Sequence, residues 1–431
     1  MKNDILDIFK EGLLIRTSLI FISLFPVTLL LSTAILNAII VIMNVLFLIH
    51  VFSEKKFSIF NNDLFYFLFA LWAFFIINTL LNANFQENYS RGFGFVRFIL
   101  FIFLFLYFFS YKNFLFKKII LNIWTIIFII VSLDLIFEFF VGFNTLGFKA
   151  NYPGRLAGFM GADELKIGHW YLCFSLIILS NNFNQHKKFW FFLFFSIFVC
   201  FLIGERANFI RLFFALLLLT IITNRISFKG LSITIFIIGS IFFTVQILEK
   251  NEQKASNEVA GTWNNKLEID DRYFSIINFF KADSIREMHN NNKYTPMYFG
   301  AYNVFKENKF LGAGLGSYYK KSGEMFRKYE KFNEYIILPN THPHQYSLEI
   351  LATLGLPGFL FIFLFLFYFI YKSFSFYSPI KKIINLSSFL MIIVFFIPLL
   401  PTGSFFTTYG ATIFWLNFSL MNLGNIKNIN Y

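Results

Sequence analysis

The chain contains little charge. Asp, Glu, Lys and Arg make up 14% of its 431 residues, whereas hydrophobic residues make up 57%. A soluble domain of this size does not need so much apolar surface. Repeated runs of about 20 apolar residues are typical of membrane-spanning helices. The runs do not alternate between apolar and polar side chains, which excludes the strands of a membrane barrel. The composition therefore predicts an all-α membrane protein.

Cysteine and metal-ligand patterns are also scarce. Cys173 and Cys200 are the only cysteines and both fall inside apolar runs, so we interpret them as small core residues. His342 and His344 are two residues apart, but no third ligand follows at a suitable spacing. Gly312–Gly316 lacks the Lys-Ser/Thr ending of a nucleotide loop and is interpreted as a tight turn. We therefore expect no metal and no cofactor.

The apolar runs predict about twelve transmembrane helices. The first is predicted to be uncleaved, because no small-residue cleavage site follows it. The helices are expected near residues 14–32, 34–52, 62–82, 92–110, 115–141, 164–180, 187–204, 207–223, 230–248, 344–371, 382–400 and 404–423. The long helix at 344–371 is expected to begin outside the bilayer.

The formal net charge of +13 reflects the distribution of cations among the loops. With a cytoplasmic N-terminus, the inside loops contain most of the lysines, as the positive-inside rule predicts. We therefore expect both termini in the cytoplasm, and no nucleic-acid partner. The few cations of the outside loops are mainly Arg91, Lys149, Arg155 and Arg206. Arginine suits phosphate recognition through two parallel hydrogen bonds, although interfacial snorkelling also explains such residues.

Three regions follow from this topology. Residues 1–248 hold about nine spans, residues 249–343 form an outer loop of about 90 residues, and residues 344–431 hold about three spans. Two stretches of the loop, 270–282 and 296–309, show helical apolar spacing and predict short amphipathic helices. The loop ends at His344, where a polar segment meets an apolar run. Chemistry on a lipid-linked substrate has to occur at such a boundary.

The sequence contains three notable motifs, FLIGERANFIRLFFALLLL, HNNNKYTPMYFGAYNVFKENKFLGAGLGSYY and THPHQYSLEILATLGLPGF. Together they resemble the O-antigen ligase and O-antigen polymerase superfamily of bacterial membrane proteins. In THPHQYSLEILATLGLPGF, His344 takes the place of the family histidine, while Gly355 and Gly358 match its glycines. Gln345 replaces the usual Asn and keeps an amide. FLIGERANFIRLFFALLLL places Arg206 at the arginine of a short outer turn, and HNNNKYTPMYFGAYNVFKENKFLGAGLGSYY resembles the outer-loop pattern. The resemblance covers about residues 190–370.

The resemblance implies a metal-independent membrane glycosyltransferase with a periplasmic active site. Its donor would be a glycan on undecaprenyl diphosphate. A ligase passes the glycan to the lipid A core oligosaccharide during lipopolysaccharide biosynthesis, and a polymerase passes it to another lipid-linked repeat. We expect a single displacement that inverts the configuration at the anomeric carbon.

The residues of this chain can be assigned to the steps of that reaction. A histidine suits the general base, because an unperturbed imidazole titrates near ~6.5. Diphosphate binding without a metal requires cationic side chains. We therefore expect His344 to be the catalytic base and Arg206, Arg211, Arg272 and Arg286 to bind the diphosphate. Supporting roles are expected for His342, His289, Gln345 and Glu349.

Two alternatives outside the enzyme class remain open. Asp134 and Glu138 lie four residues apart in one predicted span, with Arg97 in the span before it. Charges inside a membrane usually have a function. These charged residues predict either a buried ion pair that ties the two helices together or the proton relay of a polysaccharide flippase. A structural partner of a glycan assembly complex is the other alternative, and it predicts that His344→Ala leaves the phenotype intact.

Overall fold

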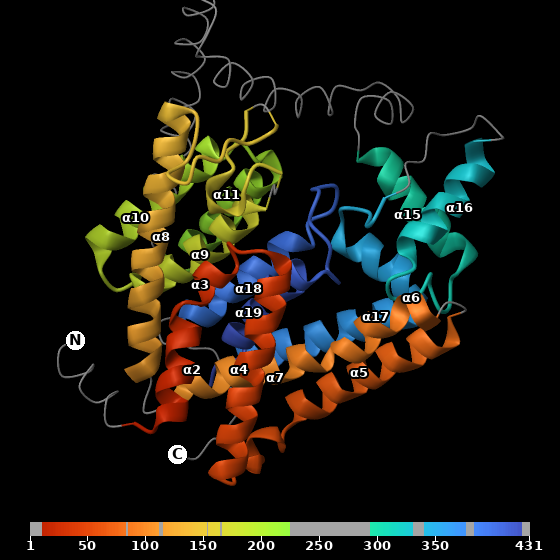
Figure 1. Ribbon diagram of the computed structural model, residues 1–431, viewed down its shortest axis with the longest axis horizontal. Helices are drawn as coiled ribbons and strands as arrows, with labels where there is room; N and C mark the ends of the chain where they lie inside the picture. The colour runs from red at the N-terminus through yellow and green to blue at the C-terminus, as the bar shows by residue number, and fades with distance from the viewer. Residues whose placement is uncertain are drawn as a thin grey trace, which may run out of the picture. The chain divides into compact units, whose positions relative to one another are not determined.

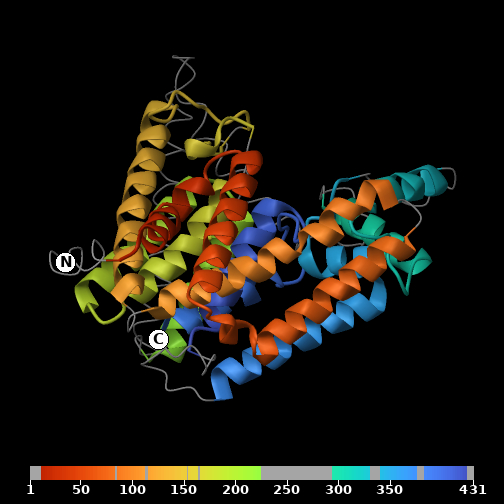
Figure 2. The ribbon, with the colours of Figure 1, turned by 60° about the horizontal axis from the view of Figure 1, so that its bottom comes forward.

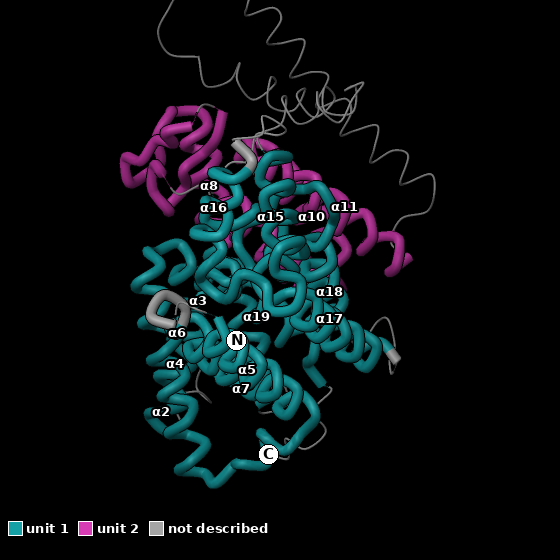
Figure 3. The backbone as a smooth tube through the Cα atoms, turned by 90° about the vertical axis from the view of Figure 1, so that its right-hand side faces the viewer, with its two compact units in different colours: residues 1–127, 283–431 teal, residues 128–282 magenta. Residues whose placement is uncertain are grey.

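The structure is a computed structural model that describes residues 11–82, 85–111, 115–152, 154–163, 166–224, 294–330, 340–375 and 383–424. The regular secondary structure of these described residues is entirely helical. The chain forms two compact units, which Figure 3 colours separately. Unit 1 comprises Met1–Ile127 and Asp283–Tyr431, and unit 2 comprises Phe128–Ala282. The boundary between residues 127 and 128 falls within one long helix, α8 (Leu115–Val141).

The first half of unit 1 follows the predicted spans closely, with one break in the first of them. Its helices are α2 (Leu13–Ser23), α3 (Phe25–Thr28), α4 (Thr33–Ser53), α5 (Asp63–Leu81), α6 (Phe85–Gly94) and α7 (Val96–Ser110). The expected single span at 14–32 is divided at Leu24, next to Pro26 in the first turn of α3. Proline has no N–H for the helical ladder, which explains the break. Polar side chains fix the helix starts, since Ser32 and Asn62 cap α4 and α5.

The second half of unit 1 contains α15 (Thr295–Glu307), α16 (Tyr318–Glu330), α17 (Tyr346–Ser375), α18 (Ile383–Phe395) and α19 (Thr408–Met421). α19 packs against α18, α7 and α4, and α17 lies alongside α5 (Figures 1 and 2). Aromatic rings fill the core, as where Trp415 contacts Phe95 and Phe405. α15 corresponds to the amphipathic helix expected at 296–309, whereas α16 was not predicted.

Unit 2 is a smaller bundle. α9 (Ile167–Asn181), α10 (His186–Leu202) and α11 (Arg206–Ile222) pack against one another. The second part of α8 contributes Phe128, whose ring stacks on Trp170 of α9. Cys173 and Cys200 are buried in this core, as the sequence predicted. After α8, a connecting segment passes through the short 3-10 helix η3 (Gly158–Met160) before α9 begins.

Five helices of the described chain are long and apolar enough to cross a membrane: Thr33–Ser53, Asp63–Leu81, Tyr89–Ser110, Phe116–Val141 and Tyr346–Phe374. Several shorter apolar helices, such as Ile383–Phe395, accompany them. The protein is therefore a helical membrane protein, as its composition predicted. The count of twelve spans and the sidedness of the loops stay predictions. The predicted span at 230–248, the predicted helix at 270–282 and both chain termini lie outside the described residues.

α17 is interrupted near its start by Gly355, which has a φ of 69° and a ψ of −174° inside the helix. The glycine-rich turn at 312–316 packs against this interruption. Ala313 N donates to Ala352 O at 2.7 Å, and Leu356 N donates to Lys309 O at 2.7 Å. A side chain at Gly355 would overlap the backbone of Phe310. The interruption thus exchanges helical hydrogen bonds for bonds to the turn, which explains why α17 continues through it.

Candidate functional site

His344 has an unusual backbone conformation. It lies just before α17 and has a φ of 56°, which is in the left-handed region that β-carbon atoms disfavour. Such backbone conformations persist only where the surroundings enforce them, and they gather at functional sites. The imidazole is half-buried. The structure therefore holds this histidine in a defined position.

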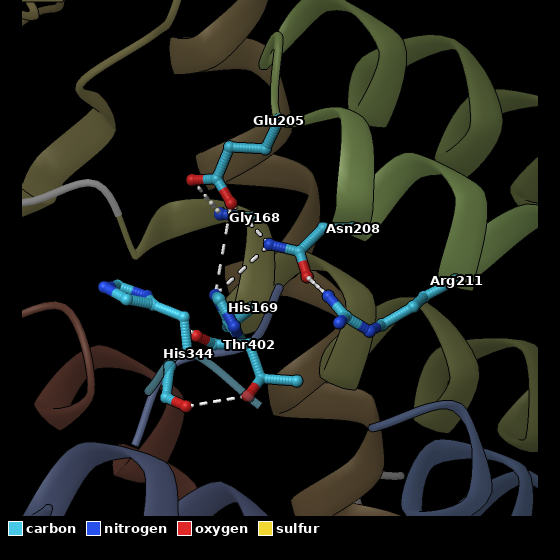
Figure 4. A network of polar contacts seen from close by, with 8 residues as sticks. Gly168, His169, Glu205, Asn208, Arg211, His344 and Thr402 are labelled. Carbon is cyan, nitrogen blue, oxygen red and sulfur yellow. Dashed lines mark hydrogen bonds and ion pairs between the residues drawn. The ribbon is translucent and has the colours of Figure 1, made fainter. Parts of the chain in front are cut away.

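Two hydrogen bonds join His344 to Thr402, in the segment between α18 and α19. Thr402 N donates to His344 O at 2.6 Å, and Nδ1 of the ring lies 3.1 Å from Thr402 O (Figure 4). A carbonyl oxygen can only accept, so Nδ1 carries the proton of this bond. In the neutral ring the basic lone pair is then on Nε2. The pairing thus selects the tautomer that a general base needs.

Glu349 holds the same segment from one turn further along α17. Its buried carboxylate accepts a hydrogen bond from Ser404 Oγ at 2.5 Å and another from Phe405 N at 2.6 Å. Ser404 Oγ in turn accepts from Phe406 N at 3.2 Å, just before α19. The segment that fixes the His344 ring is therefore anchored to the helix that follows His344.

Gln345 has a local structural role. Its side-chain Oε1 accepts from Leu348 N at 2.7 Å, which caps the first turn of α17. Asparagine and glutamine both offer an amide oxygen for such a bond, and a cap contributes about 1 kcal/mol. Gln345 is itself buried. Its position between His344 and the helix therefore helps to define where α17 begins.

An aromatic residue at the N-terminal end of α15 lies beside the imidazole. The Tyr294 ring, which immediately precedes α15, meets the His344 ring edge-on with 5.5 Å between centroids. His342 lies on the same turn, with its ring centroid 4.1 Å from that of His344. Tyr298 of α15 donates a hydrogen bond to Leu399 O at 3.3 Å. The residues around His344 therefore come from three parts of unit 1.

In unit 2, a tight turn between α10 and α11 carries a second group of polar residues. Gly204 has a φ of 73°, and a side chain there would overlap Gly154 O of the segment after α8. Leu156 N donates to Ile203 O at 3.2 Å in the same contact. Arg155 is thereby fixed beside the turn. Glu205 and Arg206 follow Gly204 at the start of α11.

Asn208 connects the polar side chains of this turn (Figure 4). Its Nδ2 donates to Glu205 Oε2 and lies 3.2 Å from His169 Nδ1, and its Oδ1 accepts from Arg211 Nη1 at 3.2 Å. Glu205 also accepts from Gly168 N at 3.3 Å, at the start of α9. A side chain at Gly168 would overlap the Glu205 carboxylate. The network therefore fixes the first turns of α9 and α11 together.

The Glu205 carboxyl is buried, and this burial raises its pKa above the ordinary glutamate value. Arg155, the hydrogen bonds from Asn208 and Gly168, and Arg211 oppose the increase. Burial removes water from the charged form, while these neighbours stabilise it. Burial is the larger effect, so the protonated form of Glu205 is favoured in the folded protein relative to an exposed glutamate.

The predicted site residues are distributed over both units and the undescribed part of the chain. His342, His344, Gln345 and Glu349 belong to unit 1, and Arg206 and Arg211 to unit 2. Arg206 is half-buried at the start of α11, whereas Arg211 has 0% exposed surface and bonds to Asn208. Arg272, Arg286 and His289 lie outside the described residues.

Sequence reasoning did not find the partners Thr402, Ser404, His169 and Asn208. Their contacts join segments that are distant in the sequence, and no local pattern signals them. Arg155 was visible only as one of the few outer-loop cations. Its position next to the Gly204 turn, which makes it a candidate site residue, is visible only in the structure.

Asp134 and Glu138 hold the connecting segment after their own helix. Asp134 Oδ1 accepts from Thr145 N at 2.9 Å and from Thr145 Oγ1 at 2.6 Å. Glu138 accepts from Ala157 N at 2.6 Å and Gly158 N at 2.8 Å. Two carboxylates that bind backbone donors in this way have a structural role. This arrangement gives no support to the proton relay of a flippase.

The comparisons with known proteins agree with the motifs. Residues 191–363 match the family model described as O-antigen ligase. This confirms the relationship to the O-antigen ligase and polymerase superfamily that the three motifs indicated. The matched range contains Arg206, Arg211 and His344 and includes parts of both units. No curated protein matches the chain. The family supports ligase-type or polymerase-type function in general, with lipid-linked glycan and acceptor substrates.

Proposed function

We propose that this protein is an O-antigen ligase that transfers a glycan from undecaprenyl diphosphate to the lipid A core at the periplasmic face of the inner membrane. The observation that carries the proposal is the pairing of His344 with Thr402. It orients a half-buried imidazole with its basic lone pair on Nε2. The family match supplies the class of reaction.

The proposed chemistry is one displacement without a metal. Nε2 of His344 accepts the proton of the acceptor hydroxyl as its oxygen attacks the anomeric carbon. A bond forms between this oxygen and the carbon, and the bond from the carbon to the diphosphate oxygen breaks. The electron pair leaves with undecaprenyl diphosphate. The attack comes from the face opposite the leaving group, so the anomeric configuration inverts.

The diphosphate requires positive charge as it leaves, and we assign this role to Arg206. A guanidinium can bind two phosphate oxygens through parallel hydrogen bonds. Arg206 is half-buried on a turn that the Gly204 contact and the Glu205–Asn208 network hold. For Arg211, full burial and its bond to Asn208 favour a supporting role within this network. Arg272 or Arg286 from the outer loop is proposed to complete the binding of the diphosphate.

The direct test is glycosyl transfer by the purified protein in detergent, with an undecaprenyl-diphosphate glycan and lipid A core. His344→Ala should lower the rate about 10²–10⁴-fold, the usual contribution of a general base. His186→Ala is the matched control. His186 starts α10, and its ring nitrogen pairs with Trp190 in an exposed position, so transfer should be unchanged. Wild-type-like transfer by the His344→Ala protein, folded and inserted, would remove the basis of the proposal.

The alternative within the family is a polymerase, which the same residues would serve. A deletion strain distinguishes the two through its lipopolysaccharide on a gel. Loss of a ligase leaves long glycans on the carrier lipid, so the core stays bare. Loss of a polymerase leaves core that carries single repeats. The detergent assay separates both enzymes from a flippase. A flippase only moves its substrate across a membrane, so it would transfer no glycan in detergent, where no sealed compartment exists.

A further inference from the structure

Arg97 is a cation within an apolar helix of unit 1, and the proposed reaction does not use it. It lies in the first turn of α7 and is half-buried. Among the described residues, no acidic side chain forms a salt bridge with it. Charge at membrane depth is costly, so an unneutralised arginine there indicates a binding partner.

The hydrogen bonding of Arg97 is incomplete. A guanidinium offers five N–H donors. Within the described part of the chain, its one side-chain hydrogen bond runs from Nη2 to Thr408 Oγ1 at 3.4 Å. The Nε atom is buried and has no partner there. The Phe98 ring lies beneath the guanidinium at 4.9 Å, which supports the charge but supplies no acceptor.

The polar neighbours of Arg97 hold it in place. Thr408 Oγ1 donates to Asn37 Oδ1 at 3.1 Å, so its lone pairs face the arginine. Asn44 Nδ2 donates to the Arg97 carbonyl at 2.7 Å. These contacts join α4, α7 and α19, which all pack together. A snorkelling arginine would extend into water instead of turning inward to this cluster.

The position of the cluster favours an anion. Arg97 and Thr408 belong to the first turns of α7 and α19, and Asn37 to the second turn of α4. The N-terminus of α19 at Thr408 carries partial positive charge, which adds to that of the guanidinium. On the predicted topology these three ends lie at the outer leaflet. The neighbouring parts of α4, α6 and α7 carry exposed apolar side chains, Ile35, Phe93 and Val96.

We propose that Arg97, with Thr408, binds the phosphate group of a membrane lipid. The guanidinium fork matches phosphate oxygens, and the exposed apolar side chains suit the hydrocarbon chains of the same molecule. Two sources carry this group at the outer leaflet: the phosphodiester of a phospholipid and the phosphomonoester of a polyprenyl carrier. The proposal does not depend on glycosyl transfer.

The test is native mass spectrometry of the full-length, delipidated protein. Three probes are titrated separately: phosphatidylglycerol, undecaprenyl phosphate and diacylglycerol, which lacks the phosphate. Wild type should retain at least one phosphate-bearing probe about tenfold better than diacylglycerol, the equivalent of one strong ionic contact. Preference for phosphatidylglycerol identifies a phospholipid as the source, and preference for undecaprenyl phosphate identifies the carrier.

Substitutions then locate the site. Arg97→Gln should abolish the preference, and Thr408→Val should weaken it, since valine keeps the shape and removes the hydroxyl. Lys372→Gln is the control, because Lys372 is a cation of the same unit that already pairs with Asp63 at 2.6 Å. Its variant should bind like wild type. Equal retention of all three probes, or an unchanged preference in the folded Arg97→Gln protein, would overturn the proposal.

Discussion

At the residue scale, the proposed chemistry depends on how the His344 side chain is held in position. His344 has one ring nitrogen bonded to Thr402 O, and its peptide oxygen accepts from the same residue. Two bonds to one residue fix both the backbone and the ring. The left-handed φ of His344 is maintained by this pairing. The segment at 401–407 is thus part of the candidate site, although it carries no titratable side chain.

Arg206→Lys tests whether the turn between α10 and α11 needs the shape of a guanidinium or only a positive charge. Lysine keeps the positive charge but presents a point charge in place of the fork. We expect transfer to fall about 10²–10³-fold, in the range for loss of an oriented donor to a developing negative charge. The rate is measured with the purified protein in detergent. Arg155→Lys, on the neighbouring segment, shows whether any loss is specific to position 206. Full activity of Arg206→Lys would argue against bidentate diphosphate binding there.

Glu205→Gln tests the buried carboxyl. Its folded-state pKa is raised by burial, so protonation favours the folded state. The stability that this provides is fully present below the unfolded-state value of about 4.3 and is lost as pH rises through the folded-state pKa. Apparent melting temperatures between pH 4 and 8 should therefore fall more with rising pH for wild type than for Glu205→Gln.

Glutamine also loses one of two accepted hydrogen bonds, which lowers stability equally at every pH. The diagnostic quantity is therefore the difference in apparent melting temperature between the two proteins, and how this difference changes with pH. A difference that does not change with pH would show that Glu205 keeps the same protonation state throughout this range.

At the element scale, the main finding is that α17 is not a uniform span. The sequence predicts one long helix at 344–371, and the structure has a non-helical Gly355 within it. The turn at 312–316 fills the gap, and Asn78 of α5 donates to Leu311 O at 2.7 Å beside it. These contacts also position α15, which brings Tyr294 to His344. The packing of Gly312 against Gly355 therefore links α15 to the position of His344.

Gly355→Ala tests this packing. Alanine at a φ of 69° is strained, and its side chain would overlap the Phe310 backbone. We expect a loss of about 3 kcal/mol or more in stability, seen as a lower apparent melting temperature and less monodisperse protein on size-exclusion chromatography.

Gly323→Ala is the matched control, since nothing lies within 4 Å of a side chain at this position in α16. It should be neutral or stabilise by about 0.5–1 kcal/mol through helix propensity. Equal melting temperatures for Gly355→Ala and Gly323→Ala would mean that the α17 interruption tolerates a side chain.

At the scale of the whole molecule, the described chain is a set of apolar helices with a polar segment inserted before the last three. The five longest apolar helices are enough to establish a membrane protein. Its orientation rests on the distribution of lysines among the loops. Because Cys173 and Cys200 are buried, the native chain offers little background for thiol labelling. Single introduced cysteines can therefore report sidedness.

Glu54→Cys and Lys306→Cys occupy exposed positions after α4 and within α15. A membrane-impermeant maleimide should label Lys306→Cys in spheroplasts and label Glu54→Cys only after the membrane is permeabilised. This result follows from a cytoplasmic N-terminus and a periplasmic outer loop. Labelling of both positions from the same side would contradict the predicted topology.

The sequence by itself determined the helical membrane class, most helix positions, the family and the histidine and arginine candidates. Apolar run length and the identity of a few polar residues suffice for these, since lipid leaves the backbone few alternatives to a helix. Only the tertiary structure decided the tautomer of His344, the capping by Gln345, the network around Asn208 and the interruption at Gly355. Each of these depends on donors and acceptors, such as Thr402 O, that are brought close only by folding and leave no local trace in the sequence.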